Sequence, residues 1–201
     1  MKILCIGRNY AKHAKEMGNS VPTVPMIFMK PETALNYTGK MLYPSFTSDL
    51  HYELEVVIEI NKRVKNVSVE DASQCYDRIG LGIDFTARDI QAKCKSKGHP
   101  WEVSKAFDDS APLSILFSKT DYDLSNLKFQ LHLNDTMVQD GNTKDMIFKF
   151  DRLISYASKF FTLEKGDLIY TGTPEGVGPV QKGDNLIGYL EDQKLLEFSI
   201  I

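Results

Sequence analysis

The amino-acid sequence predicts a β-rich α+β fold. Short apolar runs typical of strands recur along the whole chain, whereas only a few segments have helical spacing. Strands and helices do not alternate in a βαβ rhythm, which argues against a Rossmann-like parallel sheet. The chain has 201 residues, of which 42% are hydrophobic, and contains no internal repeat or low-complexity segment. We therefore expect residues 1–201 to form one globular domain with its own core.

The first half of the chain holds four expected strands and three short helices. The runs KILCI and MIFMK are continuous apolar segments of strand length. The helix at 86–98 has the clearest ends, because Thr86 and Asp89 have capping-box spacing and Gly98 can close its last turn. The strands are expected at 2–6, 26–30, 51–60 and 79–85, and the helices at 10–17, 67–75 and 86–98.

The second half holds a longer helix among further strands. Apolar side chains that include Ile147, Phe150 and Ile154 recur at helical spacing within 146–161. Apolar segments at 114–118, 128–135, 166–172 and 194–200 are expected to be strands.

Composition and charge exclude several classes of function. The net charge of −3 gives no basic surface for nucleic acid. No apolar run approaches the roughly 18 residues that a membrane helix needs. The N-terminal apolar run is too short for a signal peptide, so a cytoplasmic protein is expected. The three cysteines are widely spaced and form no C-x-x-C motif, which favours reduced, partly buried thiols.

The strand HYELEVVIEI, at 51–60, carries an unusual number of acidic residues. Alternate side chains of a strand share a face, so Glu53, Glu55 and Glu59 lie together, opposite an apolar face. The simplest interpretation is a half-exposed strand with a solvated acidic face. Val57 interrupts that face and is the one local sign that it is not simply exposed to solvent.

Asp84 lies near the end of an otherwise apolar strand, between Ile83 and Phe85. A carboxylate there is costly if it is buried, unless it is paired, hydrogen-bonded or bound to a metal. Capping of the next helix, or exposure at the strand's end, are equally simple alternatives. If Glu53, Glu55 and Asp84 came together, they would form a hard oxygen site suited to Mg²⁺, Mn²⁺ or Ca²⁺ rather than Zn²⁺.

His13 and Glu16 are three residues apart on the first short helix, so both can lie on one face. A histidine oriented by a carboxylate is a candidate general base, although an exposed pair on a polar helix is the simpler interpretation. The loop GNSVPTVP that follows suits a lid over a site and suits an ordinary loop equally well.

Other polar residues could either belong to a site or have an ordinary structural role. Arg88 and Gln91 share a helix face and could bind a substrate carboxylate or hold Asp84, or could simply be solvated. Lys105 is a lone lysine beside apolar residues. The segment TGTPEGVG, at 171–178, follows an apolar strand and reads as a tight turn that could approach an anionic ligand. It is not a P-loop, because no G-K-[ST] follows.

Six motifs in this order make the chain resemble the fumarylacetoacetate hydrolase superfamily. They are GRNYAKHAKEM, FMKP, HYELEVVIEI, GIDFTARDIQ, GHPWEVSKAFD and TGTPEGVGPV. Each motif is weak alone, but together they span nearly the whole chain. The resemblance is to the short, single-domain branch that includes acylpyruvases and oxaloacetate decarboxylases. It implies a mixed β-sandwich roll, a homodimer and a divalent metal.

The resemblance also implies roles for individual residues. Glu53, Glu55 and Asp84 would bind the metal, Mg²⁺ or Mn²⁺, with Ca²⁺ as a substitute in a crystal. His13 and Glu16 would activate water on a mobile lid at 10–25. Lys105 would stabilise the developing oxyanion, Arg88 and Gln91 would support the site, and Thr173 would hold the substrate carboxylate. Lys30 of FMKP has less support as an outer residue of the site, and His51 and Glu59 match no role.

The function implied by this resemblance is metal-dependent hydrolysis of the C–C bond of acylpyruvates, such as acetylpyruvate or fumarylpyruvate, with oxaloacetate decarboxylation as a further activity. An isomerase or decarboxylase of 2-hydroxy-dienoate diacids, or an oxaloacetate tautomerase, is the enzymatic alternative. The His13–Glu16 pair favours hydrolysis, since an isomerase has less need to activate water. A catalytically idle relative that binds a metal and a small diacid is the third interpretation.

Overall fold

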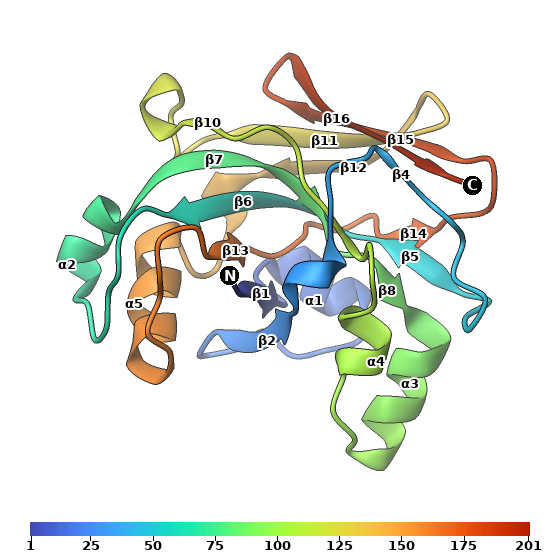
Figure 1. Ribbon diagram of the computed structural model, residues 1–201, viewed down its shortest axis with the longest axis horizontal. Helices are drawn as coiled ribbons and strands as arrows, with labels where there is room; N and C mark the ends of the chain where they lie inside the picture. Colours follow the sequence, from blue (N-terminus) through green and yellow to red (C-terminus); the bar gives the residue numbers. More distant parts are fainter.

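Two curved β-sheets stacked on each other dominate the structure, a computed structural model that describes residues 1–201 (Figure 1). The first sheet consists, in spatial order, of β10 (Phe117–Ser118), β7 (Tyr76–Ile83), β6 (Leu54–Ile60), β13 (Leu168–Tyr170), β1 (Ile3–Gly7) and β2 (Met26–Lys30). The second consists of β12 (Thr136–Asn142), β11 (Lys128–Leu133), β15 (Asn185–Leu190), β16 (Gln193–Ile200) and β4 (Lys40–Met41). Both sheets are mixed, because β1 pairs parallel with β13 and β16 pairs parallel with β4.

Two small sheets and the helices surround these layers. The small sheets are β14 (Gly178–Pro179), β5 (Leu50–Tyr52) and β8 (Thr86–Ala87), and the pair β3 (Leu35–Asn36) and β9 (Ala111–Pro112). The helices are α1 (Ala11–Glu16), α2 (Val69–Ala72), α3 (Arg88–Lys97), α4 (Glu102–Lys105) and α5 (Phe150–Phe160). Single 3₁₀ turns lie at Glu32–Ala34, Ser73–Cys75, Lys119–Asp121 and Thr143–Asp145. The predicted β-rich α+β fold is confirmed.

Strand β6 shows how the core is built. Its side chains at Leu54, Val56, Ile58 and Ile60 all enter the large apolar cluster between the stacked sheets. Val57 faces the other way and belongs to a second, smaller cluster. The predicted alternation of the strand is therefore correct. All three cysteines are free and buried, as expected. None of the helices has both the length and the apolar character required to span a bilayer.

Several predicted boundaries were wrong. The strand predicted at 51–60 breaks at Glu53, because the backbone N–H of Leu54 donates to the side chain of Gln139 at 2.9 Å. Helix α3 begins at Arg88 rather than at a Thr86 cap, since Thr86 is buried in β8.

The helix predicted from 146 begins only at Phe150, where α5 starts. The preceding residues are extended because the backbone N–H groups of Ile147 and Phe148 bond to Asn9 at 2.8 Å each. Strand β12 and helix α4 were not predicted, because β12 is mostly polar and α4 is a single turn. Strand β15 was not predicted either, although its segment NLIGYL is mostly apolar.

Candidate metal centre

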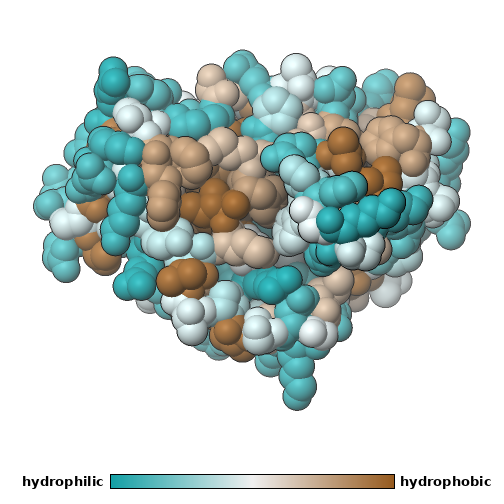
Figure 2. All heavy atoms as spheres, turned by 90° about the horizontal axis from the view of Figure 1, so that it is seen from below, coloured by the Kyte–Doolittle hydropathy of each residue, from teal (hydrophilic) through white to brown (hydrophobic).

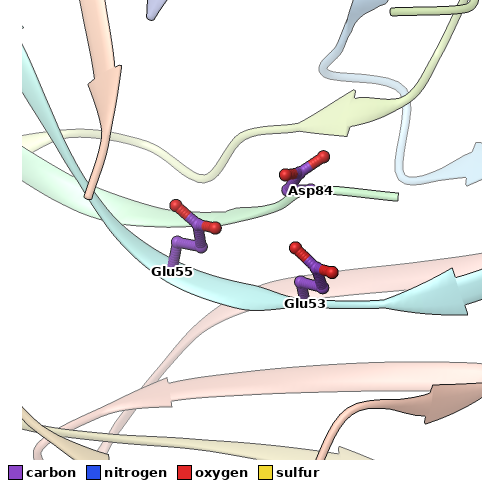
Figure 3. Close-up of side chains that lie close together, drawn as sticks. All are labelled: Glu53, Glu55 and Asp84. Atoms are coloured by element: carbon purple, nitrogen blue, oxygen red, sulfur yellow. The ribbon is translucent and has the colours of Figure 1, made fainter. Parts of the chain in front are cut away.

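Three carboxylates converge where β6 and β7 run side by side (Figure 3). Glu53 lies in the break between β5 and β6, Glu55 lies within β6, and Asp84 directly follows β7. One ligand oxygen from each lies within 4.8 Å of the others. The relative exposure of the three residues is 6%, 1% and 1%, so the solvated acidic face suggested by the strand alone is wrong for these two glutamates.

Glu59 differs from these glutamates in its surroundings. It is partly exposed and pairs with Arg78 at 3.1 Å on the sheet surface. Glu59 therefore lies on a half-exposed strand face, as the simplest interpretation of the sequence had it, and takes no part in the cluster. His51 likewise lies outside the cluster, with its Nε2 2.9 Å from Asp49.

Two lysines and one arginine surround the three carboxylates. Lys105 Nζ donates to Glu53 Oε2 at 2.9 Å and to Asp84 Oδ2 at 2.7 Å, which bridges two of the carboxylates. Lys30 Nζ lies 2.9 Å from Asp84 Oδ1, and an Arg88 guanidinium N–H donates to Glu53 Oε1. Arg88 therefore holds Glu53, Lys30 holds Asp84, and Lys105 bridges the two carboxylates.

The same neighbours divide the carboxylates electrostatically. Burial opposes the ionisation of Glu53, but the charges of Lys105 and Arg88 outweigh it and hold the pKa of Glu53 well below its usual range. Burial, together with the negative charges of Asp84 and Glu53, raises the pKa of Glu55 well above its usual range. Glu55 is thus the carboxylate that the protein's own cations leave uncompensated.

The donor set fits a hard divalent cation. Asp84 Oδ1 is buried and accepts no hydrogen bond, although Lys30 is close enough for an ion pair. Glu55 accepts a single hydrogen bond, from the backbone N–H of Gly172 at 2.7 Å. The three negative charges lie close together and are only partly compensated, so a bound cation would relieve their mutual repulsion. Oxygen ligands of this kind suit Mg²⁺, Mn²⁺ or Ca²⁺.

The backbone bond to Glu55 depends on a constrained turn. Gly172 has φ +101°, and a Cβ there would lie 2.6 Å from the Cβ of Asn9. The Asn9 side chain is itself fixed, because it donates to the carbonyls of Phe148 and Thr171 at 3.0 and 2.7 Å. The turn after β13 therefore brings its N–H groups to the carboxylates, as the TGTPEG segment suggested.

Helix α1 covers this site. His13 is buried, and its Nδ1 lies 3.3 Å from Glu16 Oε2. Glu16 also accepts the backbone N–H of Gly176 at 3.0 Å, so the acidic residue joins α1 to the TGTPEG turn. The simpler interpretation, an exposed pair on a polar helix, does not hold for His13.

One cleft collects most of the predicted site residues. The residues that line it are His13, Glu53, Glu55, Arg88, Gln91, Lys105 and Thr173. Glu16 and Asp84 do not line it but contact His13 and Lys105, which do. Arg88 donates to Gln91 Oε1 at 3.0 Å, so the pair is held together. Thr173 Oγ1 accepts from Gln139 Nε2 at 2.8 Å, which leaves the threonine's own proton free to be donated into the cleft.

Sequence reasoning missed several residues at this site. Gln139 is 1% exposed and joins the TGTPEG turn to the start of β6, but it lies in a polar stretch without any recognisable motif. Arg8 and Lys95 also line the cleft. Lys30, which had little support, proves to be fully enclosed beside Asp84.

Comparison with known proteins agrees with this architecture. The model of the family described as fumarylacetoacetate (FAA) hydrolase C-terminal matches residues 2–200. An oxaloacetate tautomerase of Escherichia coli is 44% identical over 188 residues, which cover 92% of this chain and 86% of that protein. A mitochondrial oxaloacetate decarboxylase of Dictyostelium discoideum is 43% identical over 185 residues, which cover 90% of this chain and 85% of that protein.

A solved structure shows the same fold with a metal. The fumarylpyruvate hydrolase of Pseudomonas aeruginosa, in complex with Mn²⁺ and pyruvate, superimposes with a TM-score of 0.95 at 35% identity, covering 100% of this chain and 89% of that one. The fold is thus shared with proteins named as enzymes of oxaloacetate and of fumarylpyruvate. The chain belongs to the fumarylacetoacetate hydrolase family.

Proposed function

We propose that this protein is a divalent-metal-dependent enzyme that interconverts the keto and enol forms of a small 2-oxo diacid of the oxaloacetate type. The observation that carries the proposal is the buried cluster of Glu53, Glu55 and Asp84, with Lys105 bridging two of its members. The names of the relatives, an oxaloacetate tautomerase and an oxaloacetate decarboxylase, support this reaction over the acylpyruvate hydrolysis expected first.

The residues of the cleft supply the functions that such a reaction needs. A divalent cation held by the three carboxylates would supply a Lewis acid that favours negative charge on the 2-oxo oxygen. The Thr173 hydroxyl would donate to the substrate's 1-carboxylate. His13, oriented by Glu16, would take a proton from C3 as that charge develops, and return of this proton to the 2-oxo oxygen, from His13 directly or through water, would complete the enol and restore the base.

Hydrolysis of acylpyruvates is the second candidate. The 3.3 Å contact between His13 and Glu16 favours it, since the same base could deprotonate water for attack on the acyl carbonyl. The likeness to a fumarylpyruvate hydrolase supports it as well. Decarboxylation of oxaloacetate needs no attacking water, because loss of C4 as CO₂ leaves the enolate of pyruvate, which hydrolysis of an acylpyruvate would also form.

A side-by-side assay tests the proposal. The chelated protein would be reconstituted with Mg²⁺ or Mn²⁺ and assayed for oxaloacetate tautomerisation, oxaloacetate decarboxylation and acetylpyruvate hydrolysis. We expect tautomerisation to be fastest, to disappear with EDTA and to return with either metal. Activity that is indifferent to chelation, or hydrolysis faster than tautomerisation, would reject the proposed reaction.

Substitutions at Glu53, just before β6, and at Glu59, within β6, sharpen the test. Glu53→Gln should lower activity by at least about a hundredfold, since it removes a charged ligand. Glu59→Gln is the matched control, because Glu59 lies on the sheet surface away from the cluster. Equal effects of the two substitutions would show that the cluster has no special role.

A further inference from the structure

Two aromatic rings, those of Phe28 and Trp101, form one wall of the cleft next to the carboxylates. Lys105 Nζ lies 5.1 Å from the ring centroid of Phe28, and the rings of Phe28 and Trp101 are 6.2 Å apart. Lys95 Nζ lies 5.3 Å from the Trp101 ring. Two cations thus flank the aromatic wall, one beside the acidic cluster and one beyond it.

These two lysines have different partners. Lys105 is committed to Glu53 and Asp84. Lys95 makes no hydrogen bond or ion pair with its side chain, although that side chain lines the cleft. Its pKa lies below the ordinary value, because partial burial and the positive charges of Arg88 and Arg8 disfavour the ammonium form. The outer part of the cleft therefore holds positive charge without a protein counter-charge.

Arg8 adds to this uncompensated charge. It follows strand β1 with φ +60°, in the left-handed region that bulky residues rarely adopt. The next residue, Asn9, is fixed by three hydrogen bonds of its side chain, so the turn is imposed by the surrounding structure. Arg8 lines the same cleft and has no acidic partner. Strained backbone maintained in this way is typical of functional sites.

We propose that Lys95, assisted by Arg8, binds the distal carboxylate of a dicarboxylate substrate whose 2-oxo acid end faces the acidic cluster. The assignment rests on the proposed function, and it adds the residues that distinguish a diacid from a 2-oxo acid with a neutral tail. Helix α3 then serves both ends of the substrate, since Arg88 in its first turn holds Glu53 and Lys95 in its last turn reaches the outer cleft. Figure 2 views the underside of the molecule, to which β2, α3 and α4 contribute, with hydrophobic side chains at the centre of the face and hydrophilic ones around them.

Substrate pairs that differ in one carboxylate test this role. Lys95→Met removes the charge and keeps an apolar stem, and Lys95→Arg keeps the charge. Lys97→Met is the control, because Lys97 is a lysine of the same helix that does not line the cleft. With the Mn²⁺-loaded protein, Lys95→Met should raise KM for oxaloacetate and fumarylpyruvate by about tenfold or more, the usual worth of a charged hydrogen bond. KM for acetylpyruvate should change less than about twofold, and Lys95→Arg should restore diacid binding.

A binding measurement decides the matter without turnover. The Mn²⁺-loaded wild type should bind 2-oxoglutarate more tightly than pyruvate, and Lys95→Met should remove most of that difference. Proportional weakening of both ligands, or no effect of Lys95→Met, would overturn the assignment. If oxaloacetate is not turned over at all, the proposed function fails. The binding of 2-oxoglutarate and of pyruvate, measured by titration calorimetry, still tests the role of Lys95 in that case.

Discussion

Lys30 Nζ lies 2.9 Å from Oδ1 of Asp84, and both residues are about 1% exposed. The lysine also donates to the carbonyl and hydroxyl oxygens of Ser110, at 3.1 and 3.0 Å, so its position is fixed from both sides. A lysine buried in the sheet thus fixes the orientation of Asp84, and does so without lining the cleft.

Removal of this cation should be costly. Lys30→Met leaves Asp84 with only one of its two lysines, and breaking a buried ion pair typically costs about 3–5 kcal/mol. Urea denaturation of the metal-free protein measures the loss, with the exposed Lys93→Met as control. Saturating Mn²⁺ should recover part of the lost stability, because the cation would compensate the charge of Asp84. A Lys30→Met protein as stable as the wild type would contradict the pairing of Lys30 with Asp84.

Removal of the charge of Glu55, unlike removal of Lys30, should stabilise the metal-free protein. The pKa of Glu55 is raised by burial and by Asp84 and Glu53, so the folded protein binds more protons than the unfolded chain above the unfolded pKa of about 4.3. Stability therefore falls as the pH rises through this window. Glu55→Gln keeps an acceptor for Gly172 and removes the charge.

The metal-free Glu55→Gln protein should accordingly melt several degrees above the wild type at pH 7, with the difference vanishing near pH 4. Mn²⁺ should no longer raise its melting temperature. Scanning calorimetry at the two pH values, with and without Mn²⁺, measures both effects. A variant that is less stable at pH 7 would show that Glu55 is not electrostatically uncompensated.

Glu16 should control the segment predicted to be a lid at 10–25. Its carboxylate accepts the N–H of Gly176, and its partial exposure limits the worth of that bond to roughly 1 kcal/mol. Glu16→Ala should therefore speed tryptic cleavage after Lys12 and Lys15 about fivefold. The exposed Glu70→Ala serves as control, and equal cleavage rates in the two variants would separate Glu16 from lid closure.

Asp89 should make the start of α3 sensitive to acid. Partial burial opposes its ionisation, but hydrogen bonds from the Thr47 hydroxyl and from the N–H groups of Ile90 and Ser48 hold its pKa below the usual value. The stabilisation is thus present above the unfolded pKa of about 3.9 and is lost as pH falls through the lower folded value.

Asp89→Asn should consequently be less stable than the wild type at pH 7, and the gap should close below about pH 3. Denaturation curves over this range measure it, with the exposed Asp192→Asn as control. A gap that is independent of pH would point to lost packing rather than lost charge.

Much of the fold was predictable because its strands carry a strong local pattern. The alternation in β6 assigned its apolar residues to the large cluster without any knowledge of the partner strands. Strand β12, which is mostly polar, lacked such a signal. Gln139 in β12 is buried only because its amide satisfies Thr173 and Leu54, which lie far away in the sequence.

The site was predictable from motifs but not from local physics. Nothing in the strand alone distinguishes Glu55 from Glu59, since both have the same phase. The difference arises from cross-strand neighbours: Glu55 pairs with Gly82, whereas Glu59 pairs with Arg78, which supplies a surface counter-charge. The cations that serve Asp84 come from β2 and α4, and no sequence pattern joins these segments.

The acidic cluster draws Glu53 from the break before β6, Asp84 from the end of β7 and its bridging Lys105 from helix α4 further along the chain. Such contacts between distant segments form late, when the loops that join them have closed. A chain with an incomplete central sheet would have no place for the cation. A ligand that binds only the folded form shifts the folding equilibrium toward that form. If the acidic cluster binds the proposed cation, scarcity of that metal in the cell would lower the abundance of this protein as well as the proposed activity.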